Sequence, residues 1–298
     1  MKPRKKLNLN LAGWGFVSIG TIFILIFAFY PMVDAFLLSL QSGMGINLRF
    51  VGLTNYRRLF SDTFFLTAVR NTLLYLVVQV PVMLLLGIIL ASILNDKTIK
   101  FRGFFRTAIF MTCITSLVAY STVFGYLFGH NGIINMAMVN IGLIDQPIGW
   151  LFDPFWARIT IIIAITWRWT GYNMIFYLSA MQNIDDNVYE AARIDGANTV
   201  QQFFRITIPL LKPIILFTSI MSTIGTLQLF DEVWTITNRG GPGISTLTIS
   251  PYIYNLMFVF TPDFGYAATV SYAIVFMVVI LAIIQFKVAG DKREKTKH

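Results

Sequence analysis

Charged residues are scarce in this sequence: they occupy 12% of its 298 positions, whereas hydrophobic residues occupy 56%. The mean hydropathy of +0.69 lies well above that of an ordinary soluble domain. The net charge is +9, but the basic residues border apolar stretches. A groove for single-stranded nucleic acid would instead alternate them with aromatic residues, so nucleic-acid binding is not indicated. The composition predicts an all-α integral membrane protein.

Cysteine occurs once, as Cys113 within an apolar stretch, so the chain cannot form an internal disulfide. The two histidines, His130 and His298, belong to no cluster with the spacing of a metal site. The phosphate-binding sequence Gly-x-x-x-x-Gly-Lys-Ser/Thr is missing, which excludes an ATPase of that type. No grouping of nucleophile and base indicates an enzyme. We therefore expect no metal, no cofactor held by this chain and no catalysis.

Long apolar runs dominate the sequence. A helix needs about 20 apolar residues to cross a bilayer core of roughly 30 Å, and six stretches satisfy this. They cover residues 11–40, 72–94, 107–128, 159–181, 213–234 and 266–286. The first is too long for a signal-peptide core and no small-residue cleavage site follows, so we expect an anchor that is retained. Residues 247–260 are too short for a seventh span, and we expect an interfacial or re-entrant segment there.

The basic residues set the expected orientation. They concentrate before the first stretch, between the second and third, between the fourth and fifth, and after the sixth. Because cytoplasmic loops carry an excess of Lys and Arg, both termini are predicted to face the cytoplasm. This predicts a basic cytoplasmic segment at residues 1–10, a membrane domain at 11–288 with a cytoplasmic loop at 184–212, and a basic tail at 289–298.

The loop between the fourth and fifth stretches reads as two short helices joined by a turn. Asp185 or Asp186 can cap the first helix, and Gly196 tolerates the left-handed conformation of a helix end. Thr199 and Gln202 fit a capping box for the second helix. The prolines that follow are expected to interrupt this helix before the next span. On spacing alone, an ordinary ordered surface loop fits equally well.

The same loop resembles the loop signature of permease subunits of ATP-binding-cassette (ABC) importers, in the subfamily that takes up carbohydrates. The matching residues are Glu190, Ala191, Ala192, Asp195, Gly196, Ala197, Phe203, Ile206 and Pro209. The likeness covers essentially the whole chain, with weaker matches at residues 52–57 and at 237–242. It implies a type I importer permease fold with six spans, similar to the larger permease subunit of the maltose transporter, in a prokaryotic cell membrane.

The resemblance also implies partners. A second homologous permease would complete the pathway, and two nucleotide-binding ATPase subunits would hold ATP and Mg. An extracellular or periplasmic solute-binding protein would deliver a sugar or oligosaccharide. The loop would insert into a cleft of an ATPase subunit: its small alanines permit close approach, and Glu190 and Asp195 offer carboxylates to basic partner residues. Gly196 would set the angle between the two helices.

Polar and aromatic residues interrupt the fourth and fifth stretches and are candidates for a substrate pathway. They are Trp167, Arg168, Trp169, Thr170, Gly171, Tyr172, Asn173 and Met174, with Thr223, Thr226, Leu227, Gln228, Phe230 and Asp231. By resemblance, the segments around 170–174 and 223–230 correspond to sugar-contacting regions. Sugar sites combine aromatic faces with amide and hydroxyl groups. Each tryptophan also fits a packing role. The charge of Arg168 fits either an acidic substrate or a structural ion pair with Asp231, Glu232 or a residue of a second subunit.

Rival functions remain at this stage. A secondary carrier or channel would work without an ATPase, but such carriers often place carboxylates in mid-membrane, and the second, third and sixth stretches carry none in their apolar cores. An inactive assembly scaffold would not need polar groups in mid-membrane. The sequence favours an importer permease.

Overall fold

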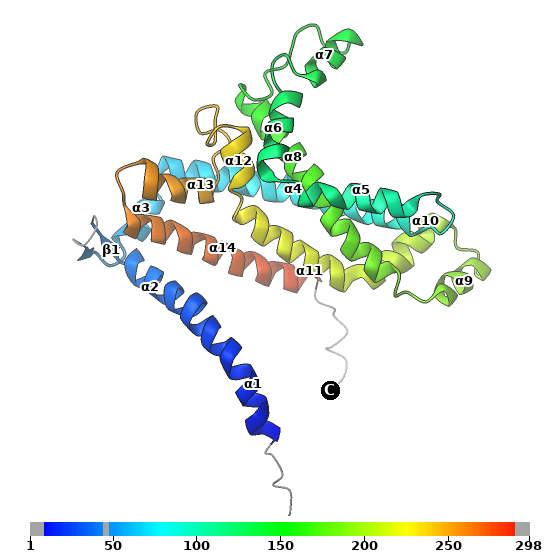
Figure 1. Ribbon diagram of the computed structural model, residues 1–298, viewed down its shortest axis with the longest axis horizontal. Helices are drawn as coiled ribbons and strands as arrows, with labels where there is room; N and C mark the ends of the chain where they lie inside the picture. The colour runs from blue at the N-terminus through cyan, green and yellow to red at the C-terminus, as the bar shows by residue number, and fades with distance from the viewer. Residues whose placement is uncertain (1–8, 44–47, 290–298) are drawn as a thin grey trace, which may run out of the picture. The chain divides into compact units, whose positions relative to one another are not determined.

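The computed structural model describes residues 9–43 and 48–289 (Figure 1). The basic terminal segments that support the predicted orientation lie outside these residues. The chain divides into two compact units, Met1–Ser61 with Ile253–Tyr272 and Asp62–Tyr252 with Ala273–His298. Each unit is described by itself.

The first unit begins with a long apolar helix made of α1 (Leu9–Ile24), the π-helical η1 (Leu25–Phe29) and α2 (Tyr30–Ser39). It continues with the antiparallel strands β1 (Gln41–Ser42) and β2 (Arg49–Phe50), then α3 (Thr54–Leu59), and later includes η3 (Asn255–Val259). The most apolar 18-residue window of the first helix buries none of its residues. Such a helix is suited to a lipid environment, as expected for a retained anchor.

The amide of Asn55 ties α3 to the end of this helix. Its Nδ2 donates to the carbonyl oxygens of Ser39 and Gln41 at 3.0 and 2.8 Å. Arg58 adds an ion pair of 2.7 Å with Asp263, within the same unit. A buried polar group such as the Asn55 amide is stable only when hydrogen-bonded, so its contacts define how α3 meets the end of this helix.

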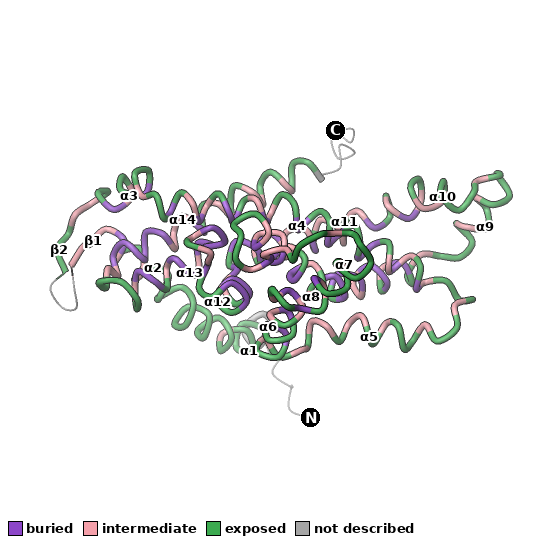
Figure 2. Tube along the Cα trace, turned by 90° about the horizontal axis from the view of Figure 1, so that it is seen from above, coloured by how far each residue is buried: buried purple, intermediate pink, exposed green. Residues whose placement is uncertain are grey.

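The second unit contains most of the helices. They are α4 (Thr63–Asn95), α5 (Arg102–Ile114), α6 (Leu117–Leu127), α7 (Ile133–Asn140), α8 (Pro154–Met181), α9 (Asp186–Ile194), α10 (Thr199–Gln202), η2 (Phe203–Thr207), α11 (Ile208–Leu227), α12 (Asp231–Ile236) and α13 (Ile249–Tyr254), followed by the later part of α14 (Phe264–Ala289). Helices α4, α8 and α11 pack against one another, and α5 packs on α8. Their buried residues are visible in Figure 2.

Small residues let these helices approach closely, as is common within membranes. Ala91 of α4 and Ala164 of α8 are fully buried. A Cβ at Gly87 of α4 would lie 3.3 Å from both Asn173 and Tyr177 of α8. The tight α4 and α8 contact therefore forms the framework of this unit.

Aspartates define where helices α4 and α8 begin. Asp62 accepts hydrogen bonds from the backbone N–H groups of Phe64 and Phe65 at the start of α4. Asp153 caps α8 in the same way, with Pro154 in the first turn. N-cap oxygens satisfy backbone donors that have no partner inside the helix, and proline suits the first turn. Both helices therefore begin earlier than the apolar stretches predict.

Among the described residues, four helices are long and apolar enough to cross a membrane: Gly13–Ser39, Thr63–Asn95, Thr199–Leu227 and Phe264–Val288. The pair α5 and α6 counts as a fifth if it forms one broken span. Helix α8 has 28 residues but does not join this set, since Arg168, Thr170 and Asn173 interrupt its apolar run. The count of six spans stays a prediction.

The third predicted span is not one helix. Helix α5 ends at Ile114, α6 begins at Leu117, and the two are bent by 99°. Thr115 and Ser116 at the break have ψ angles of 134° and 136°, outside the helical range. The Thr115 hydroxyl also bonds the carbonyl oxygen of Met111. Short hydroxyl side chains compete in this way with regular helix bonding, which accounts for a break at two adjacent polar residues.

The fifth predicted span ends earlier than expected. Helix α11 ends at Leu227 and not at Trp234, and residues 228–230 connect it to the short helix α12. The N–H of Gln228 still bonds the carbonyl oxygens of Ile224 and Thr226. This turn places Asp231 and Glu232 at the start of a separate helix, and brings both toward α8 as described below.

The prediction that Pro209 and Pro213 interrupt the loop's second helix is wrong. Helix α10 continues through η2 into α11, so Thr199–Leu227 is one helix of 29 residues. In η2 the N–H of Ile208 bonds the Phe203 carbonyl, five residues earlier. Pro209 lies in the first turn of α11, where its missing N–H and fixed φ are tolerated. The loop is therefore mechanically continuous with the fifth span.

Candidate functional site

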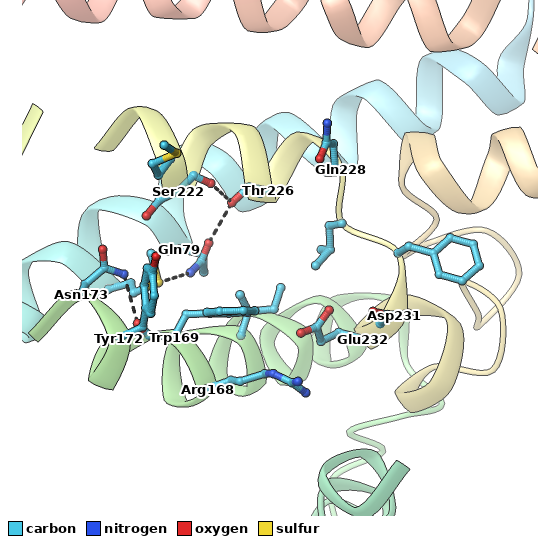
Figure 3. Close-up of a pocket in the computed structure, with 16 residues that line it drawn as sticks. Gln79, Arg168, Trp169, Tyr172, Asn173, Ser222, Thr226, Gln228, Asp231 and Glu232 are labelled. Atoms are coloured by element: carbon cyan, nitrogen blue, oxygen red, sulfur yellow. Dashed lines mark hydrogen bonds between the residues drawn. The ribbon is translucent and has the colours of Figure 1, made fainter. Parts of the chain in front are cut away.

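A cavity of about 380 Å³ lies between α4, α8, α11 and the start of α12 (Figure 3). Its volume is within the range of roughly 300 to 1,000 Å³ that is usual for small-molecule sites. It is lined by Gln79, Met83, Ile165, Arg168, Trp169, Tyr172, Asn173, Met221, Ser222, Gly225, Thr226, Gln228, Leu229, Phe230, Asp231 and Glu232. The mixture of aromatic, amide, hydroxyl and charged groups can hold a polar molecule with apolar faces.

The structure brings together part of the predicted substrate pathway. Arg168, Trp169, Tyr172 and Asn173 all line the cavity because their spacing of three and four residues places them on one face of α8. From the other side the cavity receives the predicted Thr226, Gln228, Phe230 and Asp231. A contiguous block of residues was predicted, whereas a helix presents only one face of such a block.

The remaining predicted residues of α8 face other parts of the molecule. Trp167 stacks on Tyr120 with ring centroids 5.8 Å apart. A Cβ at Gly171 would lie 2.1 Å from the carbonyl oxygen of Ile109, so this glycine lets α5 pack on α8. Thr170 bonds its own helix through the Thr166 carbonyl. Met174 is fully buried among α4 and α11 side chains.

Two predicted residues of α11 also point away from the cavity. Thr223 accepts a hydrogen bond of 2.7 Å from Nε2 of Gln285, which also donates to Ser219 at 3.1 Å. Leu227 is fully buried. These contacts connect α11 to α14, so their role in this arrangement is helix packing.

Helix α4 contributes residues that the sequence reasoning missed. Gln79 is fully buried and lines the cavity with Met83. Its Nε2 donates to the Met83 sulfur at 3.1 Å, and its Oε1 accepts from Thr226 at 3.4 Å. A glutamine within an apolar run is a signal of function in membrane helices, and this would have identified it.

Arg168 and Glu232 bring opposite charges into the cavity. The Arg168 guanidinium lies over the rings of Tyr120 and Trp169, at 4.9 and 5.6 Å from their centroids. Glu232 is 5% exposed and lines the same cavity as Arg168. Figure 3 shows the two charged ends close together. Nε and Nη1 of Arg168 are nevertheless buried without a hydrogen-bond partner.

The loop between α8 and α11, which is predicted to be cytoplasmic, forms a second candidate site. Asp185 caps α9, which confirms one of the two N-cap residues, Asp185 or Asp186, that the sequence predicts. After the helix, Gly196 has φ +80°, its N–H bonds the Arg193 carbonyl and the N–H of Ala197 bonds the Ala192 carbonyl. This is the Schellman arrangement that favours glycine at a helix end. The predicted capping box is displaced by one residue, to Asn198 and Gln201.

The predicted coupling residues are distributed over the surface and base of this loop. Glu190, Ala191, Asp195, Gly196 and Pro209 are exposed, and Ala192 and Ala197 are partly exposed. Phe203 instead packs against the buried cluster of α4, α8 and α11. Three large apolar side chains that the prediction did not include are also exposed: Ile194 at 87% and Val200 and Phe204 at 64% each. Exposed apolar side chains grouped on a loop are typical of an interaction surface.

Two contacts connect α9 to neighbouring helices. The hydroxyls of Tyr189 and Thr207 are 3.0 Å apart, which joins α9 to η2. Lys97, in the connection after α4, forms an ion pair of 2.8 Å with Asp186. The hydrogen bond and charge of Lys97 lower the pKa of the Asp186 carboxyl. Through these two contacts, a movement of α9 would be transmitted to both α4 and α11.

Comparisons with known proteins agree with this architecture. A family model described as "Binding-protein-dependent transport system inner membrane component" matches residues 72–294. The chain is 54% identical over 289 residues to the lactose transport system permease protein LacF of Rhizobium radiobacter, covering 97% of each protein. It is 34% identical to the arabinooligosaccharides transport system permease protein AraP of Halalkalibacterium halodurans, covering 89% of this chain and 84% of that one.

The fold is also found in a solved structure. A chain of a bacterial ABC transporter involved in the import of the acidic polysaccharide alginate has a TM-score of 0.80 and 23% identity, covering 98% of this chain and 99% of that one. This likeness supports the type I importer permease fold. The relatives are transport permeases, which are not catalytic. The chain therefore belongs to the family of binding-protein-dependent transport system inner membrane components, the permeases of ABC importers, and is a multi-pass protein of the plasma membrane.

Proposed function

We propose that this chain forms, with a second homologous permease, the membrane pathway of an ATP-driven importer for a sugar or oligosaccharide. The observation that carries the proposal is the cavity between α4, α8 and α11. Trp169 and Tyr172 offer aromatic faces, and Asn173 and Gln79 offer amides. Aromatic faces suit the apolar side of a sugar ring, and amides suit its hydroxyls. Relatives named for lactose and arabinooligosaccharide transport support this substrate class.

The energy would come from partner subunits. ATP and Mg would bind two nucleotide-binding subunits, and a solute-binding protein outside the membrane would deliver the sugar. We place the docking of an ATPase subunit at the loop of α9 and α10, where Ile194, Val200 and Phe204 expose apolar surface. The exposed carboxylates of Glu190 and Asp195 would bind basic groups of that subunit. The continuous helix from Thr199 to Leu227 would carry the movement to the cavity.

The test is sugar-stimulated ATP hydrolysis by the reconstituted complex with its binding protein, using wild type and Gly196→Trp. No atom lies within 4 Å of a Cβ built at Gly196, so the indole would project into the partner cleft and abolish the stimulation. Gly142→Trp is the matched control, because Gly142 also has positive φ, at +71°, after a helix and in open space. Full stimulation in Gly196→Trp would contradict the docking site. No stimulation of wild type by any sugar would contradict the proposed function.

A further inference from the structure

We propose that Arg168 and Glu232 act as a hydroxyl-binding pair that makes the cavity selective for neutral sugars over carboxylated sugars. This inference rests on the proposed function and refines its substrate class. It differs from both interpretations of Arg168 that the sequence leaves open, an acidic substrate and a purely structural ion pair.

The first argument is the unused bonding capacity of Arg168. A guanidinium carries five N–H donors, and buried donors without a partner are costly. Nε and Nη1 are both buried without a hydrogen-bond partner, although the carboxylate of Glu232 lines the same cavity. A purely structural ion pair would be expected to use these donors directly, as bidentate arginine and carboxylate pairs do. The donors are therefore placed for a ligand.

The second argument is that other contacts hold both charged groups in place. Arg168 lies over the faces of Tyr120 and Trp169, and Glu232 is 5% exposed in the first turn of α12. Both groups can therefore keep their positions without an ion pair between them. Preorganised groups of this kind lose little freedom when a ligand binds, which favours affinity.

The third argument is chemical complementarity. A sugar hydroxyl both donates and accepts, so one hydroxyl, or two on neighbouring carbons, can donate to Glu232 and accept from Arg168. A ligand carboxylate has no proton to donate and would be repelled by Glu232. The pair is neutral as a whole, so it offers no net attraction to an anion. The amide of Gln79, whose Nε2 bonds only the weakly accepting sulfur of Met83, adds a donor on the opposite wall.

The test uses calorimetry to measure the direct binding of lactose and of lactobionate to the purified complex, without the binding protein. Lactobionate has nearly the size of lactose but carries a carboxylate. Wild type is expected to bind lactose and to discriminate against lactobionate. Because a hydrogen bond to a charged group contributes about 1.5 to 3 kcal/mol, Glu232→Gln should weaken lactose binding roughly tenfold or more. It should also strengthen lactobionate binding, because Arg168 then attracts the anion unopposed.

Arg168→Gln should weaken binding of lactose without any gain for lactobionate. Asp145→Asn and Arg70→Gln make the same charge changes at exposed positions outside the cavity, and they should bind like wild type. Should a single variant fail to assemble, the double variant Arg168→Gln/Glu232→Gln keeps the site neutral and should bind both ligands weakly with little discrimination. An unchanged ratio of the two affinities in Glu232→Gln, or in the double variant, overturns this proposal. Absence of lactose binding by wild type would also overturn this proposal, whereas the proposed function fails only if no sugar stimulates ATP hydrolysis when the binding protein is present.

Discussion

Single residues in this permease serve packing or binding according to the helix face that they occupy. Arg168 and Tyr172 lie in the block of α8 that the sequence predicts as a substrate pathway, and both line the cavity. Gly171 lies between them in sequence, yet it contacts the backbone of α5. Residue type alone therefore identifies a functional segment of a helix, whereas the packing of neighbouring helices decides which of its side chains reach the ligand.

Gly171→Ala should destabilise the contact between α5 and α8. The added Cβ would lie 2.1 Å from the Ile109 carbonyl oxygen and 2.8 Å from its carbon, so backbone must move. Overpacking of this kind costs about 1 to 3 kcal/mol. Thermal unfolding of the purified complex should show a lower midpoint. Gly103→Ala is the control on α5, where no atom lies within 4 Å, and it should leave the midpoint unchanged or raise it slightly.

Long helices were predictable from this sequence because hydrophobic length is a local property. Helices α4, α8 and α14 each contain the apolar stretch that predicts them. The break at Thr115 and Ser116 was not predictable, since two small polar residues leave the average hydropathy of the stretch high. The cavity was partly predictable, because a charged residue in an apolar run marks α8 and a glutamine in an apolar run marks α4. Only the packing of the helices shows that Gln79 and Arg168 line the same cavity.

At the scale of the elements, one hydrogen bond and one ion pair connect α9 to neighbouring helices, and the two contacts are expected to contribute unequally to stability. Lys97 and Asp186 are 76% and 72% exposed, so solvent and salt screen their attraction. Because the pKa of Asp186 is lowered in the folded chain, any stabilisation from this pair is present above the usual carboxyl pKa. It disappears only as pH falls through the lowered value. The partly buried bond between Tyr189 and Thr207 should contribute more.

Tyr189→Phe should therefore loosen α9 more than Lys97→Gln does. A neutral hydrogen bond contributes about 1 kcal/mol, which corresponds to a roughly fivefold increase in local opening. Hydrogen exchange of the α9 amides in the purified complex measures this opening. Tyr126→Phe, at a tyrosine of α6 that is 75% exposed, serves as the control and should exchange like wild type. Equal protection of α9 in Tyr189→Phe and wild type would show that the hydroxyl pair does not hold this helix.

At the scale of the whole molecule, the sequence has the apolar helices of a transport permease and does not have the phosphate-binding motif of an ATPase subunit. It has no phosphate-binding Gly-x-x-x-x-Gly-Lys-Ser/Thr sequence, and its loop of α9 and α10 exposes the apolar side chains of Ile194, Val200 and Phe204. Apolar surface of this kind is stabilised when a partner covers it. Transport should therefore depend on the assembled complex.

Uptake into proteoliposomes separates an importer from a carrier that works alone. The purified chain by itself should accumulate no labelled sugar, whereas the complex with its second permease, ATPase subunits and binding protein should do so when ATP is supplied on the ATPase side. Dissipating proton and sodium gradients with ionophores should leave this uptake unchanged, because ATP hydrolysis and not ion flow drives it. The buried carboxylate of Glu232 is the group that a carrier would need for ion coupling. Ionophore-sensitive uptake by the chain alone would assign it that role and would refute the importer.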